Sequence, residues 1–120
     1  SRQAKAKLAP FGVSPLQYAV LKALWLKDGR SGADLGSALR LDSASITGVT
    51  DRLEALGLVQ RDGDADDRRV NRLYLTSRGK ALEGPLDKAM DQLNDEIGAA
   101  LGSGYAALRS NLRRLGQIEN

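Results

Sequence analysis

Apolar residues recur at helical spacing along much of the chain. The run Ser14-Pro15-Leu16-Gln17 predicts a helix start, because it places an N-cap serine before a proline and a glutamine three residues after the cap. That helix is expected to reach about Lys27, and Asp28-Gly29 should end it. Residues 4–11 show the same spacing, so they are expected to be the tail of a helix that begins earlier.

Two further helices are predicted between residues 31 and 56. Ser31 is expected to cap a short helix that ends near Leu39, and either Asp42 or Ser43 should cap the next, which runs to about Leu56. The second of these helices is apolar on one face and small or polar on the other. The apolar face carries Ile46, Val49, Leu53 and Leu56, and the opposite face carries Ala44, Thr47, Gly48 and Asp51.

A different pattern follows Gly57, which is expected to be the left-handed residue at the end of the helix. The run Leu58-Val59-Gln60-Arg61 predicts a short strand at 58–61, and the alternation of Asn71, Leu73 and Leu75 with Arg72 and Tyr74 predicts a second strand at 70–75. The residues between them, 62–69, are polar throughout. We therefore expect a β-hairpin with an exposed loop.

The last third of the chain is predicted to be helical again. Thr76 should cap a long helix, in which Pro85 should cause a kink or a restart because proline removes an amide donor and crowds the preceding turn. A final helix near 101–115 repeats its apolar residues at the spacing of a coiled coil. This spacing indicates helices that pack against a partner.

The order of these elements is that of a helix-turn-helix followed by a wing. A recognition helix needs an apolar face that holds it down and a face of short polar side chains that enters the major groove, and residues 43–56 meet both needs. A wing needs arginine near its tip to reach phosphate or the minor groove, as Arg68 and Arg69 are placed to do. The predicted fold class is mainly α with a small β-hairpin wing: a winged helix-turn-helix with long C-terminal dimerisation helices.

The charge distribution is compatible with contact to nucleic acid. Residues 1–80 hold 14 Lys and Arg against 9 Asp and Glu, whereas residues 81–120 hold 4 against 6. The net charge is +3 and the sequence pI is about 9.4. An excess of basic residues in 1–80 is typical of a region that binds nucleic acid. An ordinary solvated basic surface would give the same excess of positive charge.

The 120-residue chain contains neither cysteine nor histidine. Their absence excludes disulfides, thiol chemistry, zinc or copper sites with these ligands, and a Ser-His-Asp triad. We therefore expect no enzyme activity, no cofactor and no metal. No signal peptide is expected, and no apolar run approaches the roughly 20 residues of a membrane helix, so a soluble cytoplasmic protein without membrane contact is expected.

Two short motifs resemble ligand-binding loops but fail in detail. The loop 62–66 contains D-x-D-x-D, but a calcium loop needs glycine and glutamate where this chain has Asp67 and Leu73. The run 102–107 matches G-x-G-x-x-A, yet it follows a predicted helix instead of a strand. A solvated loop and a helix break are the simpler interpretations.

Tyr18 and Trp25 lie seven residues apart on one face of the helix that begins at Ser14. Packing in the core is the simpler interpretation of this pair. The alternative is the wall of a small-molecule pocket, because aromatic rings with a polar atom suit planar ligands. The sequence leaves both interpretations open.

Several runs resemble the MarR family of bacterial transcriptional regulators. The most specific part is the wing region, which comprises 53–61, 67–69 and 73–76 with Gly79. The opening run 14–18 and the leucines of 108–115 fit as well, so the resemblance covers nearly the whole chain.

The resemblance implies a homodimer that binds a duplex DNA operator as a repressor and is released by a small, often aromatic, ligand. It implies three parts: residues 1–13 as the tail of an N-terminal dimerisation helix, 14–76 as the winged helix-turn-helix DNA-binding lobe, and 77–120 as C-terminal dimerisation helices. The alternative is a winged-helix module that docks another protein without reading DNA.

The resemblance also implies roles for single residues. Asp42 matches an acid that braces a wing arginine, here Arg69. Gly48 stands where many relatives carry a longer base-reading side chain. The residues that match DNA-facing positions are Ser43, Ser45, Thr47 and Arg52, with Arg68 and Arg69 on the wing.

Overall fold

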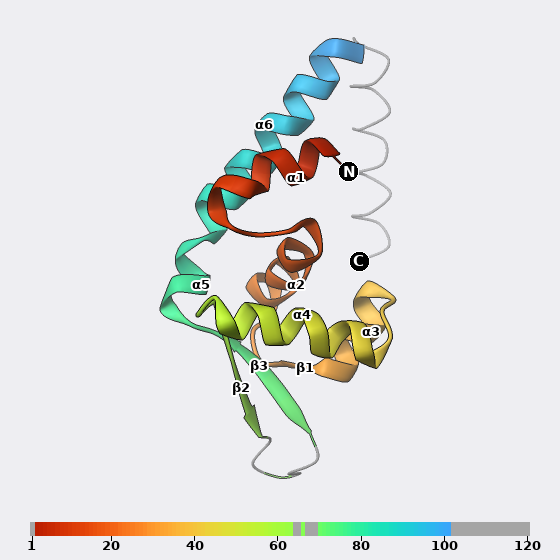
Figure 1. Cartoon of the computed structure of the whole chain (residues 1–120), viewed down its shortest axis with the longest axis vertical. Helices are drawn as coiled ribbons and strands as arrows, with labels where there is room; N and C mark the ends of the chain where they lie inside the picture. Colours follow the sequence, from red (N-terminus) through yellow and green to blue (C-terminus); the bar gives the residue numbers. More distant parts are fainter. Residues whose placement is uncertain (1, 64–65, 67–69, 102–120) are drawn as a thin grey trace.

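The computed structural model describes residues 2–63, 66 and 70–101, and these form a mainly helical fold (Figure 1). The predicted helices and hairpin within this part are present, which confirms the expected fold class. In chain order the elements are α1 (Arg2–Leu8), the 3-10 helix η1 (Ala9–Phe11), α2 (Pro15–Leu26), β1 (Arg30–Ser31), α3 (Gly32–Leu39), α4 (Ser43–Ala55), β2 (Val59–Gly63), β3 (Asn71–Leu75), α5 (Ser77–Ala81) and α6 (Glu83–Leu101).

Local caps fix where the helices begin. Ser14 Oγ accepts the Gln17 amide at 3.2 Å, and Gln17 Oε1 accepts the Ser14 amide at 3.0 Å, so both halves of a capping box start α2. Ser31 Oγ accepts the Asp34 amide at the start of α3. Of the two residues predicted to cap α4, Asp42 is the cap. These starts follow from short-range sequence alone.

The three strands form one antiparallel sheet in the order β1-β3-β2. The hairpin β2–β3 has the register Val59 opposite Leu75 and Gly63 opposite Asn71, and it projects from the helical body (Figure 1). Strand β1 pairs Arg30 with Leu73. The sequence pattern does not predict β1, because a strand of two residues is too short to show alternation.

The long helix predicted after Thr76 is divided into two. Helix α5 ends at Ala81 and α6 begins at Glu83, with Leu82 between them. Pro85 has no amide to donate to the carbonyl of Ala81, so the chain restarts a helix in whose first turn Pro85 sits. Of the two predicted effects of Pro85, the restart is the one observed.

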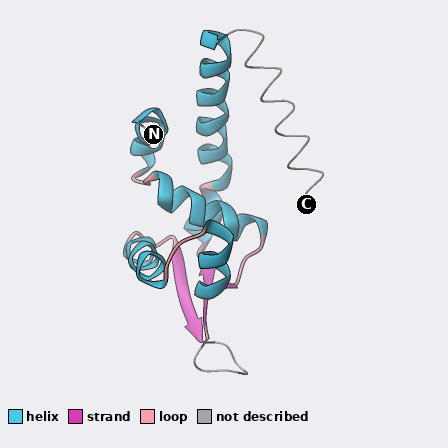
Figure 2. Cartoon of the chain, turned by 90° about the vertical axis from the view of Figure 1, so that its right-hand side faces the viewer, coloured by secondary structure: helices cyan, strands magenta, loops and turns pink. Residues whose placement is uncertain are grey.

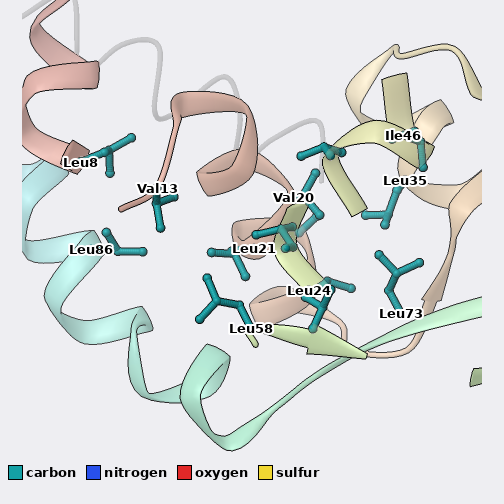
Figure 3. Packing of buried hydrophobic residues seen from close by; sticks show 14 residues of the cluster. Leu8, Val13, Val20, Leu21, Leu24, Leu35, Ile46, Leu58, Leu73 and Leu86 are labelled. Carbon is teal, nitrogen blue, oxygen red and sulfur yellow. The ribbon is translucent and has the colours of Figure 1, made fainter. Parts of the chain in front are cut away.

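One continuous apolar core joins the helices (Figure 3). Val20, Leu21 and Leu24 of α2 are fully buried in its middle. At one end, Leu8, Val13 and Leu86 bring α1, the following turn and α6 into the same core, and at the other end Leu35, Ile46 and Leu73 close it under α3, α4 and the sheet (Figure 3). Burial of each large side chain contributes about 1.5–3 kcal/mol.

We call Pro15–Leu75 the lobe, and α1 together with α6 the stem. Helix α6 extends from the lobe at the end opposite the hairpin, and α1 packs against it (Figures 1 and 2). Lys7 Nζ donates to Glu96 Oε1 at 2.8 Å between the two stem helices. Within the described ranges, no helix is both long and apolar enough to cross a membrane. The final helix predicted near 101–115 lies almost wholly outside the described residues.

The close approach of α5 to the end of α4 gives the first testable prediction. Gly79 is buried, and a Cβ at this position would overlap the carbonyl oxygen of Leu58. We expect Gly79→Ala to lower the free energy of unfolding by about 1–3 kcal/mol, because backbone would have to move, and urea denaturation followed by circular dichroism measures it.

Gly84→Ala is the matched control. Among the described residues, no heavy atom outside the backbone of its own helix lies within 4 Å of a Cβ built at Gly84, which is in the first turn of α6. This change should leave stability unaltered or raise it by about 0.4–1 kcal/mol. Equal stability of the two variants would contradict the tight contact at Gly79.

Candidate nucleic-acid interface

Helix α4 is held down by one face and exposes the other. Its side chains Ile46, Val49 and Leu53 are buried, and Thr50 is buried with them although threonine is polar. The outer face consists of short side chains and one carboxylate, namely Ala44, Thr47, Gly48, Asp51 and Ala55. Such a surface lets the helix backbone approach another molecule closely.

The residues predicted to face DNA lie along both edges of this outer face. With about 100° of rotation per residue, Ser43 and Thr47 fall on one edge, and Ser45 and Arg52 on the other. Ser43, Thr47 and Arg52 are exposed, whereas Ser45 is half-buried. The helix therefore brings these four predicted residues onto one accessible surface.

Asp42 acts on α4 from its first turn. Its Oδ1 accepts the Ser45 amide at 2.7 Å, and this backbone hydrogen bond, followed by a side-chain hydrogen bond with Ser45, lowers the pKa of Asp42. The negative charge also lies at the positive end of the helix dipole. The predicted brace partner, Arg69, lies outside the described residues, as does Arg68, so the structure describes only the Asp42 half of that pair.

A second contact ties the base of the hairpin to α4. Arg61 Nε donates to Glu54 Oε1 at 2.7 Å, the Arg61 amide donates to Glu54 Oε2 at 3.3 Å, and Arg61 Nη2 also donates to Asp51. The hydrogen bonds to Asp51 and Glu54 raise the pKa of Arg61. Because Arg61 reaches Asp51 and Glu54, the hairpin lies along the edge of α4 that carries Thr47.

Arg40 is a candidate interface residue that the sequence pattern does not reveal. It is exposed in the turn between α3 and α4, and its φ of 56° is left-handed, a conformation uncommon outside glycine. It is two residues before Asp42, the N-cap of α4. A basic residue in the tight turn of a predicted helix-turn-helix is the signal that could have pointed to it.

A cavity of about 560 Å³ lies between α3, the start of α4 and β3. Ser43, Ile46 and Thr47 of α4 line one side, and Val70 and Asn71 line another. A volume of this size is within the range of small-molecule sites. Its occupant would touch the same edge of α4 that carries two of the predicted DNA-facing residues.

Tyr18 and Trp25 pack against each other and against α5 and α6. Their rings meet edge-on, with centroids 6.0 Å apart and planes at 67°. Tyr18 Oη donates to Asp87 Oδ1 at 2.8 Å, and Trp25 Nε1 donates to the Gly79 carbonyl at 3.0 Å. Burial, then the hydrogen bond to Asp87, raises the pKa of Tyr18. Both polar atoms have intramolecular partners, and the ligand-pocket role stays a prediction.

No group of three or more potential metal ligands is close enough to hold an ion in the part of the chain that the structure describes. The predicted D-x-D-x-D run includes Asp64, which is outside that part.

Comparison with known proteins gives one consistent family. The family model described as the MarR family matches residues 13–70. The HTH-type transcriptional regulator TtmR of Methylorubrum extorquens (strain PA1) is 40% identical over 86 residues, which cover 72% of this chain and 44% of TtmR. The organic hydroperoxide resistance transcriptional regulator of Bacillus subtilis (strain 168) is 30% identical over 104 residues, which cover 87% of this chain and 69% of that regulator.

The chain spans only part of such relatives. It covers 44% of the length of TtmR and 62% of the length of the HTH-type transcriptional regulator SarZ of Staphylococcus saprophyticus. Among solved structures, reduced AbfR bound to DNA superimposes with a TM-score of 0.74 at 28% identity, over 95% of this chain and 80% of AbfR. The likeness extends over the stem as well as the lobe.

The cap of α4 gives the second testable prediction. We expect Asp42→Ala to destabilise the protein more than Asp42→Ser, because serine can still accept the Ser45 amide. Thermal unfolding at neutral pH compares the two. A larger loss with serine than with alanine would contradict the capping role.

The acid dependence of stability provides a check on the same cap. A carboxylate with a lower pKa in the folded chain stabilises the fold above its ordinary pKa of 3.8, and this contribution disappears as the pH falls through the folded value. The stability of wild type relative to Asp42→Ala should therefore fall in that acid range. A difference that does not change with pH would contradict it.

Proposed function

The chain belongs to the MarR family of transcriptional regulators, and we propose that it binds duplex DNA as a homodimer. In this proposal α4 enters the major groove and the β2–β3 hairpin is a wing that contacts phosphate or the minor groove. The observation that carries it is the division of α4 into a buried apolar face and an exposed face of short side chains. AbfR, whose fold is similar over most of its chain, is seen bound to DNA.

Roles at the interface follow from position and charge. Ser43, Ser45 and Thr47 present hydroxyls along α4, which suit hydrogen bonds to base edges or phosphates. Arg52, with Arg68 and Arg69 on the wing, supplies charge for the backbone. Asp42 braces Arg69 in addition to capping α4. Because Gly48 offers no side chain, base recognition falls to the flanking residues.

The stem and residues 102–120 form the dimer interface in this proposal. Phe11 remains 37% exposed beside α6, and a hollow of about 460 Å³ between α1 and α6 is lined by Pro10, Phe11 and Ala89 among other apolar residues, with Lys7, Lys88 and Gln92 beside them. The apolar residues of 101–115 at coiled-coil spacing predict further contacts with a partner. An apolar surface at the end remote from the hairpin leaves both α4 helices free to face DNA.

The regulator acts as a repressor that a small ligand releases. An operator-bound dimer blocks other proteins from the same DNA, and release requires only that the two α4 helices lose their correct separation. Two places can take the ligand: the cavity beside Ser43 and Thr47, and the surroundings of Tyr18 and Trp25. An aromatic ligand suits either, because both places combine apolar walls with polar atoms.

The third prediction concerns DNA binding itself. Fluorescence anisotropy with a labelled duplex from the promoter of the gene for this chain should show tight binding, and a scrambled duplex should bind more weakly. If 6–10 phosphates are contacted, affinity should fall by about 10³–10⁵-fold between about 50 and 200 mM salt, because bound counterions are released. Equal, weak binding to both duplexes, or a flat salt response, would favour a module that docks another protein.

The fourth prediction tests the wing. Arg69→Ala should weaken promoter binding by about 1–3 kcal/mol, because it removes both a DNA contact and the partner of Asp42. Lys80→Ala removes one positive charge from α5, outside α4, the hairpin and the stem, and should leave affinity nearly unchanged. The same anisotropy titration measures both variants, and unaltered affinity in Arg69→Ala would remove the wing from the mechanism.

A further inference from the structure

We propose that Asp87 is a positioning residue for DNA reading: by holding Tyr18 and Lys22, it sets the angle of the lobe on α6 and thereby the separation of the two α4 helices in a dimer. This inference rests on the proposed function, because the separation matters only for a dimer bound to duplex DNA. It gives a role to a polar cluster that lies far from the α4 surface.

Asp87 receives two donors from one helix. Its Oδ1 accepts Tyr18 Oη at 2.8 Å and Lys22 Nζ at 3.0 Å. Tyr18 and Lys22 are one turn apart on α2, and Asp87 is in the second turn of α6. Two donors from successive turns that converge on one oxygen restrict both the distance between the helices and the rotation of α2 about its own axis.

Trp25 extends this line of contacts to α5. It follows Lys22 by three residues on the same face of α2, and its indole nitrogen donates to the Gly79 carbonyl. The edge-on contact between Trp25 and Tyr18 joins the two hydrogen bonds into one unit. The lobe is thus attached on both sides of the helix break at Leu82.

Asp87 fixes the orientation of the lobe relative to α6 more than it stabilises the fold. The apolar contacts of Leu8, Val13 and Leu86 hold the lobe against the stem, but hydrophobic burial has no preferred direction. Hydrogen bonds weaken steeply when their angle changes. The Asp87 side chain is 29% exposed, and partly exposed ion pairs contribute little to stability, so its loss should loosen the angle without unfolding the protein.

The consequence appears in the DNA that the dimer selects. Half-sites must be one helical turn or a multiple apart, and successive base pairs are about 3.4 Å apart along the axis. A movement of each α4 by a few ångströms therefore changes the preferred spacing by about one base pair. The sequence of each half-site depends on α4 and the wing, which both belong to the lobe, and should not change.

The fifth prediction is tested by selection from a library of random-sequence duplexes. The full chain is used as wild type, Tyr18→Phe, Asp87→Asn and Asp91→Asn. We expect all four to enrich the same half-site, with the Tyr18→Phe and Asp87→Asn proteins shifting the preferred spacing by about one base pair or enriching several spacings. Asp91→Asn is the matched control for charge, because Asp91 is an exposed carboxylate one turn further along α6 that acts on Tyr18 through its charge and makes no hydrogen bond to Tyr18 or Lys22.

The outcomes distinguish the role of Asp87 from the proposed DNA-binding function. A single, unchanged spacing in both Tyr18→Phe and Asp87→Asn overturns the role of Asp87 while leaving the DNA-binding function intact. Failure of wild type to enrich any paired half-site overturns the proposed function, and the inference with it. Tyr18→Phe removes only a hydroxyl, so it decides the question if Asp87→Asn fails to fold. Altered spacing in Asp91→Asn as well would show a general charge effect and overturn the specific role.

Discussion

Burial of α2 from two sides is the constraint on which the other elements depend. Val20, Leu21 and Leu24 form the centre of the core, and their removal from water holds α3, α4 and the sheet on one side. On the side facing α5 and α6, the half-buried Tyr18 and Trp25 donate hydrogen bonds to Asp87 and Gly79, beside the apolar contact of Leu86. Helix α2 therefore combines non-directional packing against the rest of the lobe with directional hydrogen bonds to α5 and α6. This division explains why the two parts can share one core and still have a defined relative orientation.

The exposed face of α4 combines attraction and repulsion toward DNA. Asp51 and Glu54 would repel phosphates, but Arg61 donates to both carboxylates and offsets part of their charge. The same three residues attach the hairpin to the helix. Charge near the hairpin is therefore partly offset by a contact that also fixes geometry, and Arg40 and Arg52 are exposed.

Sequence reasoning succeeds where the determining contacts are local. The capping box at Ser14, the end of α4 at Gly57, and the restart at Pro85 each depend on a few neighbouring residues, and the structure has all three. It fails for β1, whose partner Leu73 is distant in sequence, and for Thr50, whose burial depends on what packs over α4. For the interface, residue types and helical spacing indicate the exposed positions of α4. They do not reveal Arg40 or the partners of Arg61, since these depend on a turn conformation and on a strand that folds back.

The short strand β1 has a consequence for how the chain is made. Its pairing of Arg30 with Leu73 closes the sheet, and β3 leaves the ribosome only after α2, α3 and α4. Until then β1 has no partner strand, and the unpaired main-chain groups of an exposed strand can bind a strand from another nascent chain. An edge of two residues, followed at once by a capped helix, offers very few main-chain groups for such recruitment. The minimal length of β1 thus protects the growing polypeptide during translation.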